Sequence, residues 1–150
     1  MKQKSYTGVE DLQREFSRRK DAIRRRLVEF ASVRPEEYFY ELVYCLLTPQ
    51  SSAVNAGKAV ETLRAANLFH EEVNVAELLH QKEFYIRFHN TKGRHLKEAK
   101  LKYPTIAEAL TDGQASPDLR AWLVKNVKGL GWKEASHFLR NVGRGEQFAI

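Results

Sequence analysis

The chain has few of the residues that cross-link or break a polypeptide. Its 150 residues include one cysteine, four prolines and eight glycines. A disulfide within these residues is therefore impossible, and so is a zinc or iron–sulfur site built from several cysteines. The cysteine, Cys45, stands in the apolar run Tyr44-Cys45-Leu46-Leu47, so we expect a buried and inert thiol.

Long apolar segments are also missing. No stretch approaches the roughly 20 consecutive apolar residues that a membrane helix needs. No apolar signal region follows the start Met1-Lys2-Gln3-Lys4. We therefore expect no membrane contact and an intracellular, reducing compartment.

Acidic residues are outnumbered by basic ones. There are 25 Lys and Arg against 19 Asp and Glu, which gives a net charge of +6 and a pI of about 9.5. Such an excess favours a polyanionic partner, because each phosphate that a cation neutralises releases counterions. Charge alone leaves the alternative open that the basic residues only keep the protein in solution.

Alternating strand-like patterns are absent, and helical spacing recurs instead, which predicts an all-α fold. A long amphipathic helix is expected up to Phe30, with a solvated basic face. A buried central helix should open at Pro35 and stop at Thr48-Pro49, because the residue before proline disfavours α geometry. Further helices are expected at 51–66, from about 90 to before Pro104, and at 106–110. Another should begin with Ser116 as its cap and Pro117 in its first turn, and a last helix should follow residue 131.

The carboxy-terminal end is unusual. Residues 141–145 resemble a helix stop, and Phe148, Ala149 and Ile150 then place apolar side chains at the end of the chain. We expect that the chain is cut there. A truncated chain should expose apolar surface and tend to self-associate, whereas the parent protein is expected to be a monomer.

The sharpest feature is Gly129-Leu130-Gly131 between two amphipathic helices. Two glycines around one apolar residue permit a tight turn and close backbone approach. The second helix then begins with free N–H groups and a positive dipole end, which together suit a phosphate. Most such glycine pairs are ordinary helix caps, so the turn alone is a weak signal.

The flanks of this turn make the signal specific. The segment from Val127 to Asn141, which reads VKGLGWKEASHFLRN, closely resembles the hairpin signature of the HhH-GPD superfamily of DNA glycosylases. It is most similar to the type-2 8-oxoguanine DNA glycosylase/AP lyases of archaea and bacteria. The resemblance implies that residues 1–150 are a single incomplete HhH-GPD region that lacks its C-terminal helices. It places the helix-hairpin-helix at 117–143 and implies that the helix within 1–33 packs with the missing part.

In that family the lysine two residues after the second hairpin glycine is the nucleophile, which here is Lys133. A neutral amine is needed for attack on the sugar C1′ atom, and desolvation and the helix N-terminus both disfavour the ammonium form. Attack expels the base, and the Schiff base then permits β-elimination. Without the resemblance, Lys133 would pass for an ordinary surface lysine.

The resemblance implies further contacts around the hairpin. Backbone carbonyls of Lys125, Val127 and Leu130 are expected to hold a monovalent cation, Na⁺ or K⁺, that bridges the hairpin to phosphate. No other cofactor is expected. His137 lies one helical turn after Lys133 on the same face, where it either orients the lysine, contacts phosphate or simply packs.

Two other segments are similar to family loops. Residues 46–53 resemble the loop whose glutamine probes the gap left by a flipped base, which makes Gln50 the candidate; the alternative is a polar residue at a helix start. Residues 86–93 resemble the wedge loop, with Phe88 as the apolar side chain that enters the base stack; the alternative is a core phenylalanine. Arg87 and Lys92 either contact phosphates or face water.

One part of the family pattern is missing. The family has a catalytic aspartate after the second hairpin helix, and no Asp follows Asp118 in this chain. The expected position lies just beyond Ile150, and Glu134 and Glu146 do not replace it by motif position. We therefore expect the parent protein to be active and this chain to be inactive alone.

The resemblance implies base-excision repair of 8-oxoguanine in double-stranded DNA, in the cytoplasm of a prokaryote and associated with the nucleoid. Two alternatives remain open at this point. One is a non-catalytic helix-hairpin-helix DNA-binding module, which has no need of a lysine at position 133. The other is a glycosylase for a different oxidised base.

Overall fold

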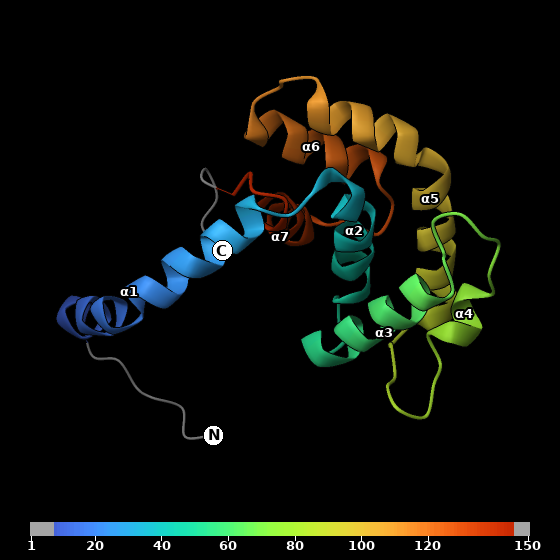
Figure 1. Cartoon of the computed structure of the whole chain (residues 1–150), viewed down its shortest axis with the longest axis horizontal. Helices are drawn as coiled ribbons and strands as arrows, with labels where there is room; N and C mark the ends of the chain where they lie inside the picture. Colours follow the sequence, from blue (N-terminus) through green and yellow to red (C-terminus); the bar gives the residue numbers. More distant parts are fainter. Residues whose placement is uncertain (1–7, 146–150) are drawn as a thin grey trace.

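The computed structural model describes residues 8–145, and within this range the chain is helical (Figure 1). The only β-type pairing among these residues is an isolated bridge between His80 and Tyr85. The expected all-α fold is therefore confirmed. The elements are α1 (Val9–Ala31), the 3₁₀ turn η1 (Pro35–Glu37), α2 (Tyr38–Leu47), α3 (Ala53–Ala65), α4 (Val75–Leu78), α5 (His89–Thr111), α6 (Ser116–Asn126) and α7 (Trp132–Asn141). The apolar end at 148–150 lies outside the described residues.

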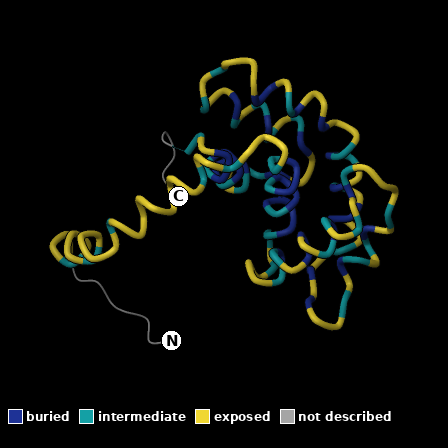
Figure 2. Tube along the Cα trace, viewed as in Figure 1, coloured by how far each residue is buried: buried dark blue, intermediate teal, exposed yellow. Residues whose placement is uncertain are grey.

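Helix α2 forms the centre of the molecule, as its apolar sequence predicts. Seven of its ten residues are buried, and α3, α5 and α7 pack around it (Figures 1 and 2). Pro35 opens a 3₁₀ turn that leads into the helix rather than opening the α-helix itself. The helix ends at Leu47 as expected, although Thr48 keeps right-handed helical angles and donates its hydroxyl to the Cys45 carbonyl at 3.1 Å.

The expected break at Pro104 is wrong. Helix α5 runs through this proline without interruption from His89 to Thr111. Proline inside a helix loses a hydrogen bond and costs about 3 kcal/mol. Buried side chains lie on the core face on both sides of it, and each contributes about 1.5–3 kcal/mol when fully buried. Packing therefore outweighs the break; the buried residues nearest to Pro104 are Ala99, Tyr103, Ile106, Ala109 and Leu110.

The expected helix start at residue 51 and the expected cap at Ser116 both shift in the structure. Ser52 caps α3, because its hydroxyl accepts a hydrogen bond from the Asn55 N–H at 3.0 Å. Ser116 is instead the first residue of α6, and Ala115 occupies the capping position without a side-chain bond. Pro117 does lie in the first turn of α6, where its missing N–H costs nothing.

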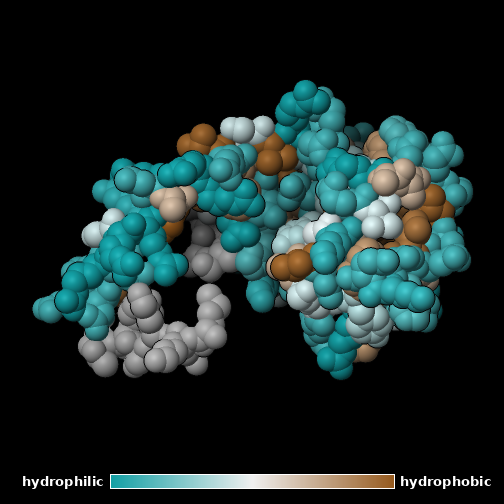
Figure 3. Space-filling view, turned by 60° about the horizontal axis from the view of Figure 1, so that its bottom comes forward, coloured by the Kyte–Doolittle hydropathy of each residue, from teal (hydrophilic) through white to brown (hydrophobic). Residues whose placement is uncertain are grey.

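Helix α1 extends away from the rest of the molecule like an arm (Figure 1). It contains no buried residue, and it contacts the body at α7. The face of the arm seen in Figure 3 is mainly hydrophilic, in keeping with its exposed arginines. Its apolar stripe is exposed as well, at Leu12, Phe16, Ile23 and Leu27. The packing of this helix against further chain stays a prediction.

None of the helices within residues 8–145 combines the length and the apolar character that crossing a bilayer requires.

Candidate DNA-binding and catalytic site

The turn between α6 and α7 is the tight hairpin that the sequence predicts. Gly129 adopts φ +87°, a left-handed conformation that favours glycine. A Cβ atom at this position would collide with the His95 imidazole of α5. Leu130 is buried beside it, and its N–H donates to the Val127 carbonyl at 3.2 Å. Glycine at position 129 thus lets the hairpin close onto α5.

The second glycine has a different place in the hairpin. Gly131 is the N-cap of α7 with φ −83°, an angle that any residue can adopt. A Cβ there would meet only the end of the flexible Glu134 side chain, with the Oε2 atom at 2.7 Å. The expectation that both glycines serve the tight turn is therefore wrong for Gly131. Apart from its chain neighbours, the Glu134 carboxylate is the only group among the described residues within 4 Å of that Cβ position.

Lys133 is the second residue of α7, at the positive end of the helix dipole. Its side chain is exposed. The desolvation that the amine needs for attack is therefore not provided by residues 8–145 of this chain. Glu134 lies in the same first turn, and its carboxylate reaches back toward Gly131. The Glu134 carboxylate thus lies where an anion that binds the N-terminus of α7 would approach.

His137 lies one turn further along α7 and is half-buried. Burial lowers its pKa below the ordinary value, and the neighbouring charges of Arg140 and Lys133 lower it further. A neutral imidazole one turn from an amine can accept a proton from it. The spacing predicted from the sequence is confirmed, while its role in catalysis stays a prediction.

The predicted gap probe and the predicted wedge lie on two adjoining loops. Gln50 is exposed after the end of α2, and Phe88 is 50% exposed at the N-cap of α5. Both have left-handed backbone angles, φ +55° and φ +59°, which are strained for a side-chain-bearing residue. A core position for Phe88 is excluded by its exposure. The Arg87 guanidinium lies 4.9 Å from the centre of the Phe88 ring.

The two loops are joined by hydrogen bonds. The Arg87 N–H donates to the Ser51 hydroxyl at 3.0 Å, and the Asn55 side chain donates to the Tyr85 carbonyl at 3.2 Å. Gln50 and Phe88 each stand next to one member of the Arg87–Ser51 pair. The structure therefore brings together two residues that lie far apart in the sequence.

Lys92 neither contacts solvent nor is available to a phosphate, so both sequence interpretations of it are wrong. Its side chain is buried, with 5% of the residue exposed. The ammonium group donates to the carbonyls of Leu47 and Pro49, at 2.9 and 2.5 Å, and to the Ser51 hydroxyl at 3.3 Å. Burial lowers the pKa of Lys92 to about 8.

A cation at the hairpin carbonyls stays a prediction. A hollow of about 540 Å³ lies between the hairpin and α5 and is lined by Lys125, Val127 and Leu130 among others. The Val127 carbonyl already accepts a bond from the Leu130 N–H. The Lys102 ammonium donates to the Asn126 carbonyl at 3.3 Å, so a positive charge from the chain itself already stands at this hollow. Among the described residues no cluster of His, Cys, Asp and Glu could hold a metal.

Two functional features escaped the sequence analysis. The contact of His95 with the hairpin has no sequence signal, because it joins distant segments. The burial of Lys92 did have one: Lys92, Leu96, Ala99 and Tyr103 share one helix face at spacings of four, three and four residues, and all are buried. A lysine on the core face of a helix indicates a buried ammonium that requires acceptors.

An all-α fold in which a glycine hairpin joins two helices and packs on a long third helix is that of a helix-hairpin-helix protein. Comparison with known families then gives the particular one. The family model of the helix-hairpin-helix 8-oxoguanine DNA glycosylases matches residues 23–150.

Proteins of similar sequence carry the same family name. An 8-oxoguanine DNA glycosylase/AP lyase of Fusobacterium nucleatum is 35% identical over 99% of this chain and 70% of its own length. One from Korarchaeum cryptofilum is 40% identical over 91% of this chain and 67% of its own length. The chain belongs to the family of 8-oxoguanine DNA glycosylases.

Solved structures agree with this assignment. The 8-oxoguanine DNA glycosylase of Thermotoga maritima superposes with a TM-score of 0.74 at 30% identity, covering 89% of this chain and 64% of that one. The Methanocaldococcus jannaschii glycosylase/lyase in complex with a 15mer DNA containing 8-oxoguanine gives a TM-score of 0.71 at 31% identity, covering 83% of this chain and 60% of that one. This chain thus spans about two thirds of the length of the relatives that it matches.

Proposed function

We propose that this chain carries the DNA-binding and Schiff-base part of an 8-oxoguanine DNA glycosylase/AP lyase. The observation that carries the proposal is Lys133, exposed in the first turn of α7 directly after a glycine hairpin, in a chain that the family model matches from residue 23 to 150. The partner is double-stranded DNA with a damaged guanine. The setting is the nucleoid in the cytoplasm of a prokaryote, and the protein acts as a monomer.

The hairpin supplies the grip on the duplex. Backbone N–H groups at the start of α7 and the positive end of its dipole bind one phosphate without reading a base. Glu134 must swing aside for this, which its flexible side chain permits. Bound DNA then covers the exposed Lys133 and removes water from its amine, so the desolvation that this residue needs comes from the substrate.

The chemistry at Lys133 has two stages. In the first, the amine nitrogen forms a bond to the sugar C1′ atom as the bond to the base breaks, and the base leaves with the electron pair of that bond and takes up the proton that the nitrogen loses. In the second, the sugar ring opens to an iminium, a proton leaves C2′, and the C3′–O bond breaks to release the phosphate strand. His137, one turn away, is the candidate to accept the proton of the amine.

The first stage needs more than the described residues provide. Loss of the base builds positive charge on the sugar, and the family aspartate that stabilises this charge has no counterpart after Asp118. Removing one preorganised stabilising group typically costs about 10²–10³ in rate. The lyase stage on a pre-formed abasic site already has its aldehyde, and so it depends much less on that carboxylate.

Borohydride trapping separates the two stages. With duplex that already contains an abasic site, this chain should give a covalent adduct after hydride reduces the iminium, and Lys133→Gln should give none. With duplex that contains 8-oxoguanine, the adduct should stay near background. The matched control is Lys128→Gln, which removes a lysine on the other side of the hairpin and should preserve trapping.

An adduct of equal yield from Lys133→Gln would refute the assignment of the nucleophile. Duplex binding with no adduct from either protein would favour a non-catalytic binding module. Excision of 8-oxoguanine at an ordinary enzymatic rate would show that another residue replaces the aspartate.

A further inference from the structure

Lys92 is buried at a place where a positive charge is doubly unfavourable. It lies in the first turn of α5, where the helix dipole is positive and repels an ammonium group. Its side chain is almost fully removed from water. A buried ammonium is retained only where acceptors replace its hydration. We therefore expect the buried ammonium to have a role that an apolar side chain at position 92 could not fill.

The acceptors come from the end of another helix. Leu47 is the last residue of α2, and its carbonyl belongs to the group that finds no partner inside the helix. The carbonyl of Pro49 and the hydroxyl of Ser51 follow within the next turn of chain. These oxygens lie at the negative end of α2, so the ammonium of α5 acts as a cap for a helix that is distant in sequence.

The same contacts fix both DNA-facing loops. Gln50 lies between two residues whose oxygen atoms bind the Lys92 ammonium, Pro49 and Ser51. The Ser51 hydroxyl also accepts the N–H of Arg87, the residue before Phe88. Gln50 and Phe88 both hold strained left-handed backbone angles, which persist only where surrounding contacts enforce them.

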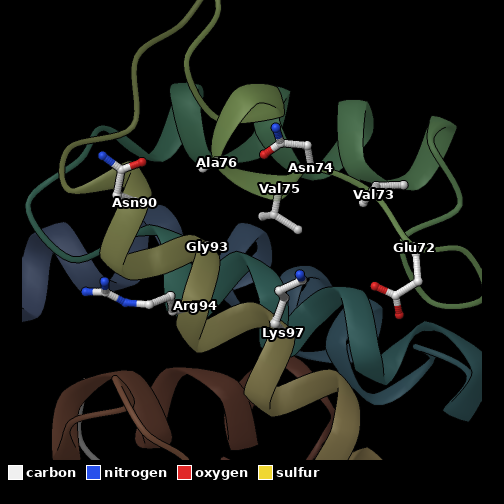
Figure 4. A pocket seen from close by; sticks show the side chains of 9 residues that line it. All are labelled: Glu72, Val73, Asn74, Val75, Ala76, Asn90, Gly93, Arg94 and Lys97. Carbon is white, nitrogen blue, oxygen red and sulfur yellow. The ribbon is translucent and has the colours of Figure 1, made fainter.

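The first turn of α5 is held from its other side as well. Gly93 faces α4, where a Cβ atom would come within 3.3 Å of the Ala76 nitrogen (Figure 4). Close packing on α4 and the Lys92 bonds to the loop after α2 therefore clamp the helix start between two elements. The base of the loop that carries Phe88 is thus packed against α4 and hydrogen-bonded to the loop after α2.

We propose that Lys92 is a positioning residue that holds Gln50 and Phe88 as one preformed unit, so that both side chains enter the duplex together at a damaged nucleotide. This inference rests on the proposed function, from which the DNA contacts of Gln50 and Phe88 come. A preformed pair avoids the entropy of ordering two loops upon binding, which raises affinity for the kinked duplex without any new contact.

The test compares two duplexes for each variant. One contains a tetrahydrofuran abasic analogue opposite 2-aminopurine, and the other is undamaged. The analogue has no base to recognise, so the assay reports loop insertion without needing a lesion pocket. Lys92→Met should reduce the preference for the abasic duplex about tenfold and reduce the 2-aminopurine fluorescence increase, because misplaced groups lose much of their effect. Affinity for undamaged duplex should change less than about twofold, since the hairpin is untouched.

The matched control is Lys97→Met, which removes the same charge from the exposed face of the same helix beside the hollow in Figure 4. It should leave the preference unchanged. A merely structural role of Lys92 would lower both affinities together with the folded fraction, and would leave their ratio intact.

The outcomes separate the two proposals. Absence of any preference in the unmodified chain would overturn the proposed function, and this inference with it. A preference in the unmodified chain that persists in folded Lys92→Met would overturn the inference alone. If Lys92→Met does not fold by circular dichroism, Ser51→Ala decides, because it removes the hydroxyl shared by Lys92 and Arg87. It should lower the preference about threefold, and an unchanged ratio would overturn the inference.

Discussion

Two regions of this molecule each carry a lysine in the first turn of a helix, and they use it in opposite ways. The hairpin exposes Lys133 and buries Leu130 beneath it. The edge formed by the loop after α2 and the start of α5 buries Lys92 and exposes Gln50 and Phe88. Lys133 is the second residue of α7 and Lys92 is the fourth residue of α5, so both lie near a helix start, and burial distinguishes the lysine that reacts from the one that supports.

The two regions also differ in the interactions that hold them in place. The hairpin is held by the shape of its backbone, because Gly129 has room for no side chain beside His95. The two-loop edge is held by side-chain bonds from Lys92 and Ser51. We therefore expect mutations in the hairpin to act by steric collision and mutations in the edge to act by loss of hydrogen bonds. Three predictions test how the two regions differ.

The largest expected effect is at Gly129. Valine there must adopt the left-handed angle, which costs about 1–2 kcal/mol, and must displace His95, which costs a further 1–3 kcal/mol or so by overpacking. The free energy of unfolding, measured by urea denaturation, should fall by about 2–5 kcal/mol in total.

Gly131→Val is the matched control within the hairpin. Its backbone angle is ordinary and only the flexible Glu134 side chain must move, so its free energy of unfolding should change by less than about 1 kcal/mol. It should still weaken binding to undamaged duplex, because a branched side chain blocks the approach of a phosphate to α7. Equal destabilisation by both variants would contradict the different places assigned to the two glycines.

A smaller effect is expected at the exposed tip of the edge. Phe88 is half exposed, so Phe88→Ala should change the free energy of unfolding by no more than about 1 kcal/mol. The wedge itself would be lost, and unstacking a base costs a few kcal/mol that alanine does not supply. The fluorescence increase of 2-aminopurine at the target should therefore fall strongly. A full signal from a stable Phe88→Ala protein would remove Phe88 from the DNA interface.

The sequence predicts the parts that local pattern controls. The continuous apolarity of residues 38–47 predicts the buried helix α2, and helical spacing predicts a helix at 51–66, where the structure has α3. The glycine hairpin and the place of Lys133 in the first turn after it also follow from a short segment of sequence, whereas the expected desolvation of Lys133 does not come from residues 8–145.

What the sequence alone does not predict depends on contacts between distant segments. Packing on both sides of Pro104 keeps α5 continuous, and the carbonyl oxygens that bind Lys92 belong to a loop more than 40 residues earlier in the chain. The ordering of Gln50 and Phe88 into one edge is likewise a tertiary effect.

The subtlest prediction concerns pH and isolates the Lys92 ammonium. Its pKa in the folded protein is lowered to about 8 by burial, from an ordinary value of 10.5. Below pH 8 the lysine is protonated in both the folded and the unfolded chain, so its contribution to stability is constant. Between about pH 8 and 10.5 the unfolded chain binds more protons at this site than the folded one, and stability therefore rises with pH.

The difference in free energy of unfolding between the unmodified chain and Lys92→Met should shift in favour of the unmodified chain across this window. The slope should stay below about 1.4 kcal/mol per pH unit, the limit for one proton. Chemical denaturation of both proteins at several pH values measures it. A difference that moves the other way would mean that the oxygens of Leu47, Pro49 and Ser51 hold the proton more strongly than burial expels it, so that the cap on α2 dominates the cost of removing the charge from water.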